Sequence, residues 1–187
     1  MVRFYKFVFS WKTIMFLSIL LLLTPVLCYN TQNVLQGLFV SNYVTLVLNN
    51  IYITMIYKRN CAIDKISYLL VTRMKRRRYI KEAIKLSILS LLVYSSVLLI
   101  VEFSFFGLPD KSYSIAFWIL VLENSMVYAT IEVILIMSIF SRYKFAYLSC
   151  SVLINFMFHY MIVLPSINKI LWKEKYYVIN KESKQKI

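Results

Sequence analysis

Five stretches of this chain are apolar over lengths close to those that cross a lipid bilayer. They cover residues 11–28, 34–57, 84–107, 114–140 and 147–164. A helix needs about 20 mainly apolar residues to span the hydrocarbon core. Hydrophobic residues make up 60% of the 187 residues and the mean hydropathy is +0.68, far more apolar than a soluble chain. The sequence therefore predicts an all-α, polytopic membrane helix bundle with about five to six transmembrane helices.

The first stretch, 11–28, is compatible with two structures. It contains the run 19–23 of one Ile and four Leu, and a basic segment precedes it. A signal peptide and a transmembrane helix both have this pattern. A cleavable signal requires small residues before its cleavage site, whereas residues 25–28 include large ones. We therefore expect an uncleaved first helix.

The remaining stretches contain features that predict how they pack. Stretch 34–57 carries several amide side chains, so it can cross a membrane only if these face other helices. Stretches 84–107 and 114–140 flank a short turn and predict a helical hairpin. The second of these is long and holds Glu123 and Asn124 near its middle. It is either tilted or divided there into two half-helices.

The positive charge of the chain predicts its orientation in the membrane. The net charge is +14, and ten Lys and Arg residues lie in the connection 58–85 against two acidic residues. Short basic connections face the cytoplasm, so we expect the N terminus and the 58–85 loop to be cytoplasmic. Nucleic-acid binding is not predicted, because the basic clusters lie between apolar stretches. Five crossings would place the basic tail outside, unless one stretch is re-entrant or divided.

Part of this connection, 62–81, has the pattern of an amphipathic helix. Apolar residues recur at steps of three and four at Ile63, Ile66, Leu70 and Met74, and polar residues occupy other faces. One interpretation is a basic helix that lies on anionic lipid headgroups and fixes the topology. The other is a helix that docks on a cytoplasmic partner.

The second interpretation rests on a resemblance to the small permease subunits of ABC-2 type exporters, particularly those of Firmicutes linked to peptide or bacteriocin export and immunity. In these, a cytoplasmic coupling helix and a basic turn precede the third span. Residues 63–73 resemble the coupling helix, 74–79 the basic turn and 80–85 the entry to the next span. The similarity covers residues 1–165, the expected transmembrane helical domain.

The resemblance implies a set of partners and contact residues. A separate cytoplasmic ATPase would bind the coupling helix, and a second permease subunit or a second copy would complete the complex in the lipid membrane. The ATPase contacts would be Ile63, Ile66, Leu70, Arg73 and Met74. The basic turn at the membrane surface would consist of Lys75, Arg76, Arg77 and Arg78.

Two features depart from this family. The sequence shows no sixth span, and a basic polar tail, 166–187, replaces the extracellular helix pair. The chain also lacks the GxxxxGK[ST] loop that cradles nucleotide phosphates. We therefore expect no cofactor and no catalytic residue in this chain, with ATP bound on the partner subunit.

Polar residues inside apolar stretches are candidates for a functional site, because a carboxylate at bilayer depth is costly. We expect Glu102 at an interface near the outer turn. Glu123 and Glu132 are nine positions apart and should point to opposite faces of one helix. Asn155 and His159 are four apart and should share a face. The possible intramembrane polar path comprises Glu123, Asn124, Glu132, Asn155 and His159.

Three functions remain open from the sequence. The first is a non-catalytic permease subunit of an exporter in the cell membrane. The second is a membrane scaffold, immunity or accessory subunit of a membrane complex. The third is a membrane-embedded peptidase, which would need a cysteine to converge with His159. Because Cys28, Cys61 and Cys150 lie in separate segments without CxxC spacing, neither a metal site nor a disulfide framework is predicted.

Overall fold

A computed structural model describes residues 11–28, 33–65, 76–111 and 113–170. These residues form helices and short turns and contain no strand, so the predicted all-α fold is confirmed for them. The α-helices are α2 (Trp11–Leu22), α3 (Thr24–Leu27), α4 (Val34–Phe39), α5 (Asn49–Lys65), α7 (Arg76–Phe106), α8 (Ser114–Met137) and α9 (Lys144–Phe158). Two π-helical segments, η1 (Tyr43–Leu48) and η3 (His159–Val163), and a 3₁₀ turn, η2 (Ser138–Phe140), extend them.

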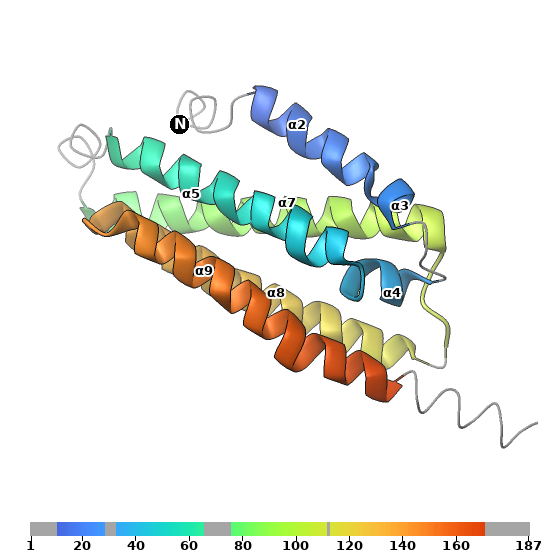
Figure 1. Ribbon diagram of the computed structural model, residues 1–187. Helices are drawn as coiled ribbons and strands as arrows, with labels where there is room; N and C mark the ends of the chain where they lie inside the picture. Colours follow the sequence, from blue (N-terminus) through green and yellow to red (C-terminus); the bar gives the residue numbers. More distant parts are fainter. Residues whose placement is uncertain (1–10, 29–32, 66–75, 112, 171–187) are drawn as a thin grey trace, which may run out of the picture.

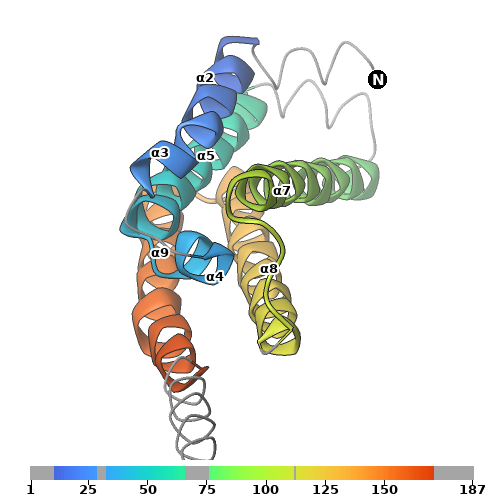
Figure 2. The ribbon, with the colours of Figure 1, turned by 90° about the vertical axis from the view of Figure 1, so that its right-hand side faces the viewer.

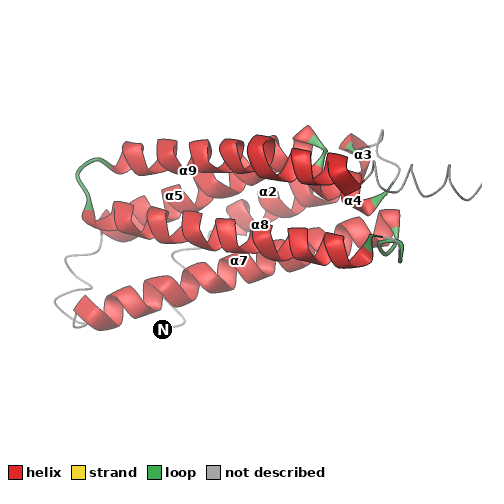
Figure 3. Cartoon of the chain, turned by 90° about the horizontal axis from the view of Figure 1, so that it is seen from below, coloured by secondary structure: helices red, strands yellow, loops and turns green. Residues whose placement is uncertain are grey.

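The long helices lie side by side, with the turns gathered at two ends of the bundle (Figures 1 and 3). We call one the Asp64 end, where α5 finishes, α7 begins and the turn from α8 to α9 lies. Lys144 pairs with Asp64 across this end. The other is the Gly107 end, with α4 and the turn from α7 to α8. Gly107 has a φ of 75° and terminates α7, as glycine does after many helices.

Three of the described helices are long and apolar enough to cross a membrane: Ile80–Phe106, Ser114–Phe140 and Lys144–Ile170. They indicate a membrane-inserted protein. The predicted count of five to six is not confirmed. Stretch 11–28 is helical in α2 and α3, but α2 has only 12 residues. Stretch 34–57 forms α4, η1 and the first nine residues of α5, with amides among its residues, and the charged residues of α5 begin directly after it at Lys58.

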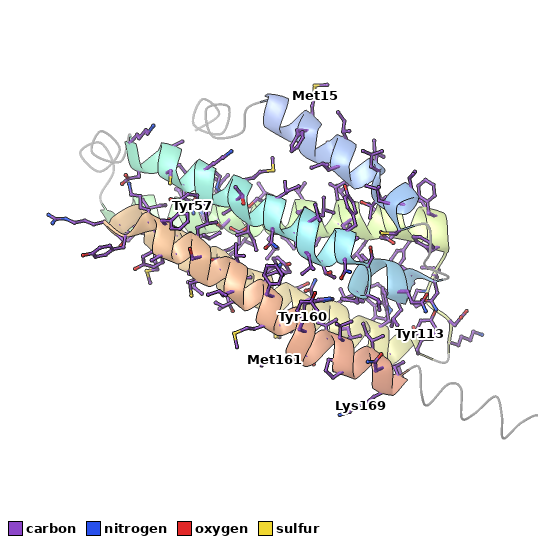
Figure 4. All side chains as sticks on the ribbon, viewed as in Figure 1. Met15, Tyr57, Tyr113, Tyr160, Met161 and Lys169 are labelled. Carbon is purple, nitrogen blue, oxygen red and sulfur yellow. The ribbon has the colours of Figure 1, made fainter. Side chains whose placement is uncertain are left out.

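Apolar side chains cover much of the outside of the described bundle. Met15 on α2 and Met161 on the last helix point away from it (Figure 4), and both are well exposed. The interior holds a separate apolar cluster drawn from most of the helices, including Leu35, Leu48 and Leu135. An apolar surface around a packed apolar core fits a lipid environment, where exposed hydrophobic side chains cost nothing.

The second stretch is broken, whereas the fourth is not. α4 ends at Phe39, the chain leaves the helix at Ser41, and η1 then continues directly into α5. By contrast, α8 runs through Glu123 and Asn124 without interruption, so the half-helix alternative for that stretch is wrong. In Figure 2, α4 lies as a separate short piece between the longer helices.

The fifth stretch does not stop at Pro165. The helix continues to Ile170, so it includes the first residues of the expected tail, and Ile167 is buried. The π-helical segment η3 explains this continuation. There the amide of Leu164 bonds to the carbonyl oxygen of His159, five residues back. A wider turn directly before the proline relieves the clash that its ring makes with the preceding turn of an α-helix.

The expected helix 62–81 is divided between two longer helices and an undescribed part. Residues 62–65 complete α5, and Arg76–Lys81 form the first turns of α7. Ile63 is buried in the bundle, so its side chain does not belong to an exposed docking face. Residues Ile66, Leu70, Arg73, Met74 and Lys75 lie outside the described residues.

Candidate functional site

An ion pair lies inside the bundle toward the Asp64 end. Arg59 on α5 and Glu132 on α8 have side chains that are each 4% exposed, and Arg59 Nη2 lies 3.4 Å from Glu132 Oε2. The buried stripe of α5 includes Tyr52, Ile56, Arg59 and Ile63. These positions follow helical spacing, so the arginine faces the core although its neighbours along the chain are polar.

Hydroxyl groups from α7 complete the surroundings of this pair. Arg59 donates from Nη1 to Ser90 Oγ and from Nη2 to Ser87 Oγ, both at 2.9 Å. Glu132 accepts hydrogen bonds from Ser87, from Ser90 at 3.3 Å and from the hydroxyl of Tyr52. Both charges are therefore matched by a partner charge and by hydrogen-bond donors or acceptors, as burial in low dielectric requires.

A second polar cluster lies around Asn155 on α9. Its Oδ1 accepts from the hydroxyl of Tyr128 at 2.6 Å, and its Nδ2 donates to Asn50 Oδ1 and to the carbonyl oxygen of Thr45, both at 3.1 Å. The π-helical segment η1 makes this carbonyl accessible. In η1 the amide of Asn49 bonds to Val44 instead, so the carbonyl of Thr45 loses its α-helical donor.

Two stacked tyrosines lie between the clusters. Tyr94 on α7 donates from its hydroxyl to Asn49 Oδ1 at 2.7 Å. Its ring stacks on that of Tyr52, with centroids 4.1 Å apart and planes 12° from parallel. Because Tyr52 bonds Glu132, hydrogen bonds and this ring contact run from the ion pair to Asn49 and join α5, α7 and α8. The Asn155 cluster, which includes the next residue, Asn50, joins α5, α8 and α9.

A small cavity of about 40 Å³ adjoins this network. Its polar lining comes from α5, α7 and α8. The polar residues are Asn49, Tyr94, Ser95, Asn124, Ser125 and Tyr128. A water needs about 10–15 Å³ of such space and two to four polar partners, so the cavity is large enough and polar enough to hold water. It is too small for a peptide or a drug-sized molecule.

The predicted polar path is partly brought together. Glu132 belongs to the ion pair, Asn155 to the second cluster, and Asn124 lines the cavity. Glu123 lies on a different side of α8 from Glu132, as its nine-residue spacing predicts, and is only half-buried. His159 shares the buried face of α9 with Asn155, and its Nε2 has no hydrogen-bond partner among the described residues.

Glu102 lies in the last turns of α7 near the Gly107 end, next to the turn where we expect it, and its side chain is fully buried inside the bundle. Neither carboxyl oxygen has a hydrogen-bond partner among the described residues. The cause is α4, which covers this part of α7 and places Gly37 against the carboxyl group.

The cysteines lie in different environments. Cys28 is buried, Cys61 is half-buried, and Cys150 is exposed on α9 away from the buried His159. Over the described ranges, His, Cys, Asp and Glu side chains form no group of three that could hold a metal ion.

The most connected residues are not among the candidates that the sequence predicts. In the sequence, Arg59 is one of ten basic residues in the connection 58–85. Ser87, Ser90 and Tyr94 are polar residues of an apolar stretch. Their helical spacing was a usable signal, because these three residues and Glu102 fall on one inner face of α7. Comparison of the chain with protein-family models, with curated proteins and with solved structures gave no match.

Proposed function

We propose that this chain is a non-catalytic permease subunit of an ABC-type exporter, coupling a separate cytoplasmic ATPase to export of a hydrophobic or peptide substrate. The observation that supports it most is the length of α7. This helix has 31 residues and begins at Arg76, inside the basic connection. At 1.5 Å per residue it is about 46 Å long, more than the hydrocarbon core of about 30 Å.

Such a helix can act as a lever. Its first turns lie beyond the apolar segment that starts at Ile80, where a partner can reach them. Deeper in the bundle, Ser87 and Ser90 contact the Arg59–Glu132 pair. A push on the beginning of α7 would therefore disturb buried polar contacts about three to four turns further along the same rigid helix. This gives a physical route from a cytoplasmic partner to the interior of the bundle.

Leu70→Glu is the first test of this proposal. Leu70 lies on the apolar stripe of the connection, so we expect a carboxylate there to prevent docking of the ATPase. The tagged chain is purified from its native membrane in mild detergent, its partners are identified, and ATPase activity is measured. The expected result is loss of a copurifying ATPase and of its activity.

Thr72→Glu is the matched control, because it adds the same charge to the same segment on the face opposite the apolar stripe. It should retain the ATPase. If only membrane proteins copurify with the wild-type chain and no nucleotide hydrolysis accompanies them, the permease proposal fails. The chain is then better described as a scaffold, immunity or accessory subunit.

The position of Glu123 supports a partner within the membrane, whether the chain is a permease subunit or a scaffold, immunity or accessory subunit. It lies nine residues into a 27-residue apolar helix, about 14 Å from its start, and its side chain is only half-buried. No hydrogen bond or ion pair joins it to another described residue. A carboxyl group at this depth is costly against lipid, so we expect a second subunit or second copy to cover it.

Glu123→Leu should therefore dissociate the membrane partner without unfolding the chain. The expected result is loss of the partner in crosslinking or size-exclusion experiments in detergent, while the unfolding temperature of the isolated chain stays unchanged or rises. Glu123→Gln keeps hydrogen bonding and should weaken the complex less. An unchanged complex in Glu123→Leu would show that this side chain is not at the interface.

A further inference from the structure

The carboxyl group of Glu102 lies in a place that suits only one of its two protonation states. Its side chain is 0% exposed and neither oxygen has a hydrogen-bond partner among the described residues. This contrasts with Glu132, which has an arginine and three hydroxyl groups as partners. An isolated carboxylate is much more costly to bury than a neutral carboxylic acid.

The close approach of α4 defines the site. Gly37 faces Glu102, and a Cβ atom on residue 37 would lie 2.5 Å from Glu102 Oε2 and 3.3 Å from Cε2 of Phe106. A Cβ atom there would displace the carboxyl tip of Glu102, so the glycine leaves open the space that the carboxyl group fills. The carboxyl tip therefore occupies the space that the Cβ atom of any residue other than glycine would occupy at position 37.

Among the described residues, the segments that surround the Glu102 carboxyl group supply no counter-charge. Residues 34–39 of α4 and 114–122 of α8 contain no ionisable side chain, and neither does α3. The titratable group that interacts with Glu102 is the thiol of Cys28, directly after α3, which shares a hydrogen bond with Ser41. A thiol carries no positive charge, so it cannot stabilise a carboxylate as Arg59 does.

We infer that Glu102 and the α4 backbone at Gly37 form a proton-binding site, whose proton holds α4 against α7. When the carboxylic acid gives its proton to water, its O–H bond breaks and a carboxylate remains without a buried partner. Water can reach it only if α4 moves. The break between α4 and η1 at Ser41 supplies a hinge, because the chain there is not helical. The site does not depend on coupling to an ATPase.

The test uses the full chain in lipid nanodiscs and infrared difference spectra between pH 5 and pH 9. We expect a carbonyl band of a protonated carboxylic acid that disappears at high pH in the wild-type chain. This band should be lost in Glu102→Gln and in Glu102→Met, and retained in Glu82→Gln, which changes a carboxylate near the start of α7. A band that survives both Glu102 variants, or a Glu102 carboxylate at pH 5, overturns the inference.

A second readout reports the movement of α4. With Cys61 and Cys150 replaced by serine, we measure how fast a water-soluble maleimide labels Cys28, which is buried beside Ser41. Relative to Glu102→Gln at the same pH, labelling of the wild-type chain should rise as pH increases, because α4 leaves α7. The comparison at equal pH removes the direct effect of pH on thiol ionisation, and a Glu102 carboxylate near Cys28 would disfavour the thiolate and so slow labelling instead of raising it. Equal labelling rates at every pH would overturn the link between the proton and α4.

Discussion

Replacing Arg59 by leucine should destabilise the chain by about 3–5 kcal/mol, since it leaves the buried Glu132 carboxylate without its counter-charge. Glu132→Leu should be similarly harmful, because the buried guanidinium group then loses its counter-charge. Both residues also lose hydrogen bonds to α7, so three helices would lose their connection at once. Equilibrium unfolding in mixed detergent micelles, followed by circular dichroism, measures the effect.

The double variant separates a lost pair from lost packing. Arg59→Leu with Glu132→Leu removes both charges, so it should be more stable than either single variant. Arg142→Leu is a suitable control, because Arg142 is exposed in the turn between α8 and α9. It should change the free energy of unfolding very little. Additive losses in the double variant would mean that the two charges do not stabilise each other.

Asn155→Leu should cost about 1–3 kcal/mol, because its partners stay buried and lose their hydrogen bonds. The partners are the hydroxyl of Tyr128, the amide of Asn50 and the carbonyl of Thr45. The loss should exceed the average of about 0.6 kcal/mol for a single hydrogen bond between membrane helices. The same unfolding measurement reports it.

Tyr128→Phe tests whether this loss comes from hydrogen bonding. It removes one of the three bonds of Asn155, so its effect should be smaller than that of Asn155→Leu and should not add to it. Met157→Leu, two positions along on the exposed side of α9, is the control for a change of side chain in the same helix. A loss in Met157→Leu as large as that in Asn155→Leu would point to general disturbance of α9.

Hydrophobic patterning could predict the helical class and the third, fourth and fifth apolar stretches. These are the segments whose composition alone suits a bilayer, and they correspond to the three long apolar helices of the structure. Patterning could not predict the break before η1 or the passage of the last helix through Pro165. Both depend on π-helical segments, which arise from packing and hydrogen bonding with other helices and leave no strong local signature.

The candidate site was predictable only in part. Glu132, Asn124 and Asn155 are polar residues within apolar stretches, so the sequence alone predicts them as candidate site residues. Arg59 sits among other charged residues near a predicted helix end, and its burial depends on a partner 73 positions away. The unpaired state of Glu102 depends equally on a neighbour, because α4 must first fold over α7. Contacts between residues so far apart in the sequence leave no signal in the local sequence pattern.

The Arg59–Glu132 pair also has a consequence for biosynthesis. The arginine is synthesised well before the glutamate that neutralises it, since α7 and the first part of α8 must be made in between. During that interval the guanidinium group lacks the Glu132 carboxylate, and a charged group without its counter-charge opposes burial in an apolar environment. Stable packing of α5 against α7 should therefore be delayed until α8 has been made. The helices would then join the bundle in an order different from their order along the chain.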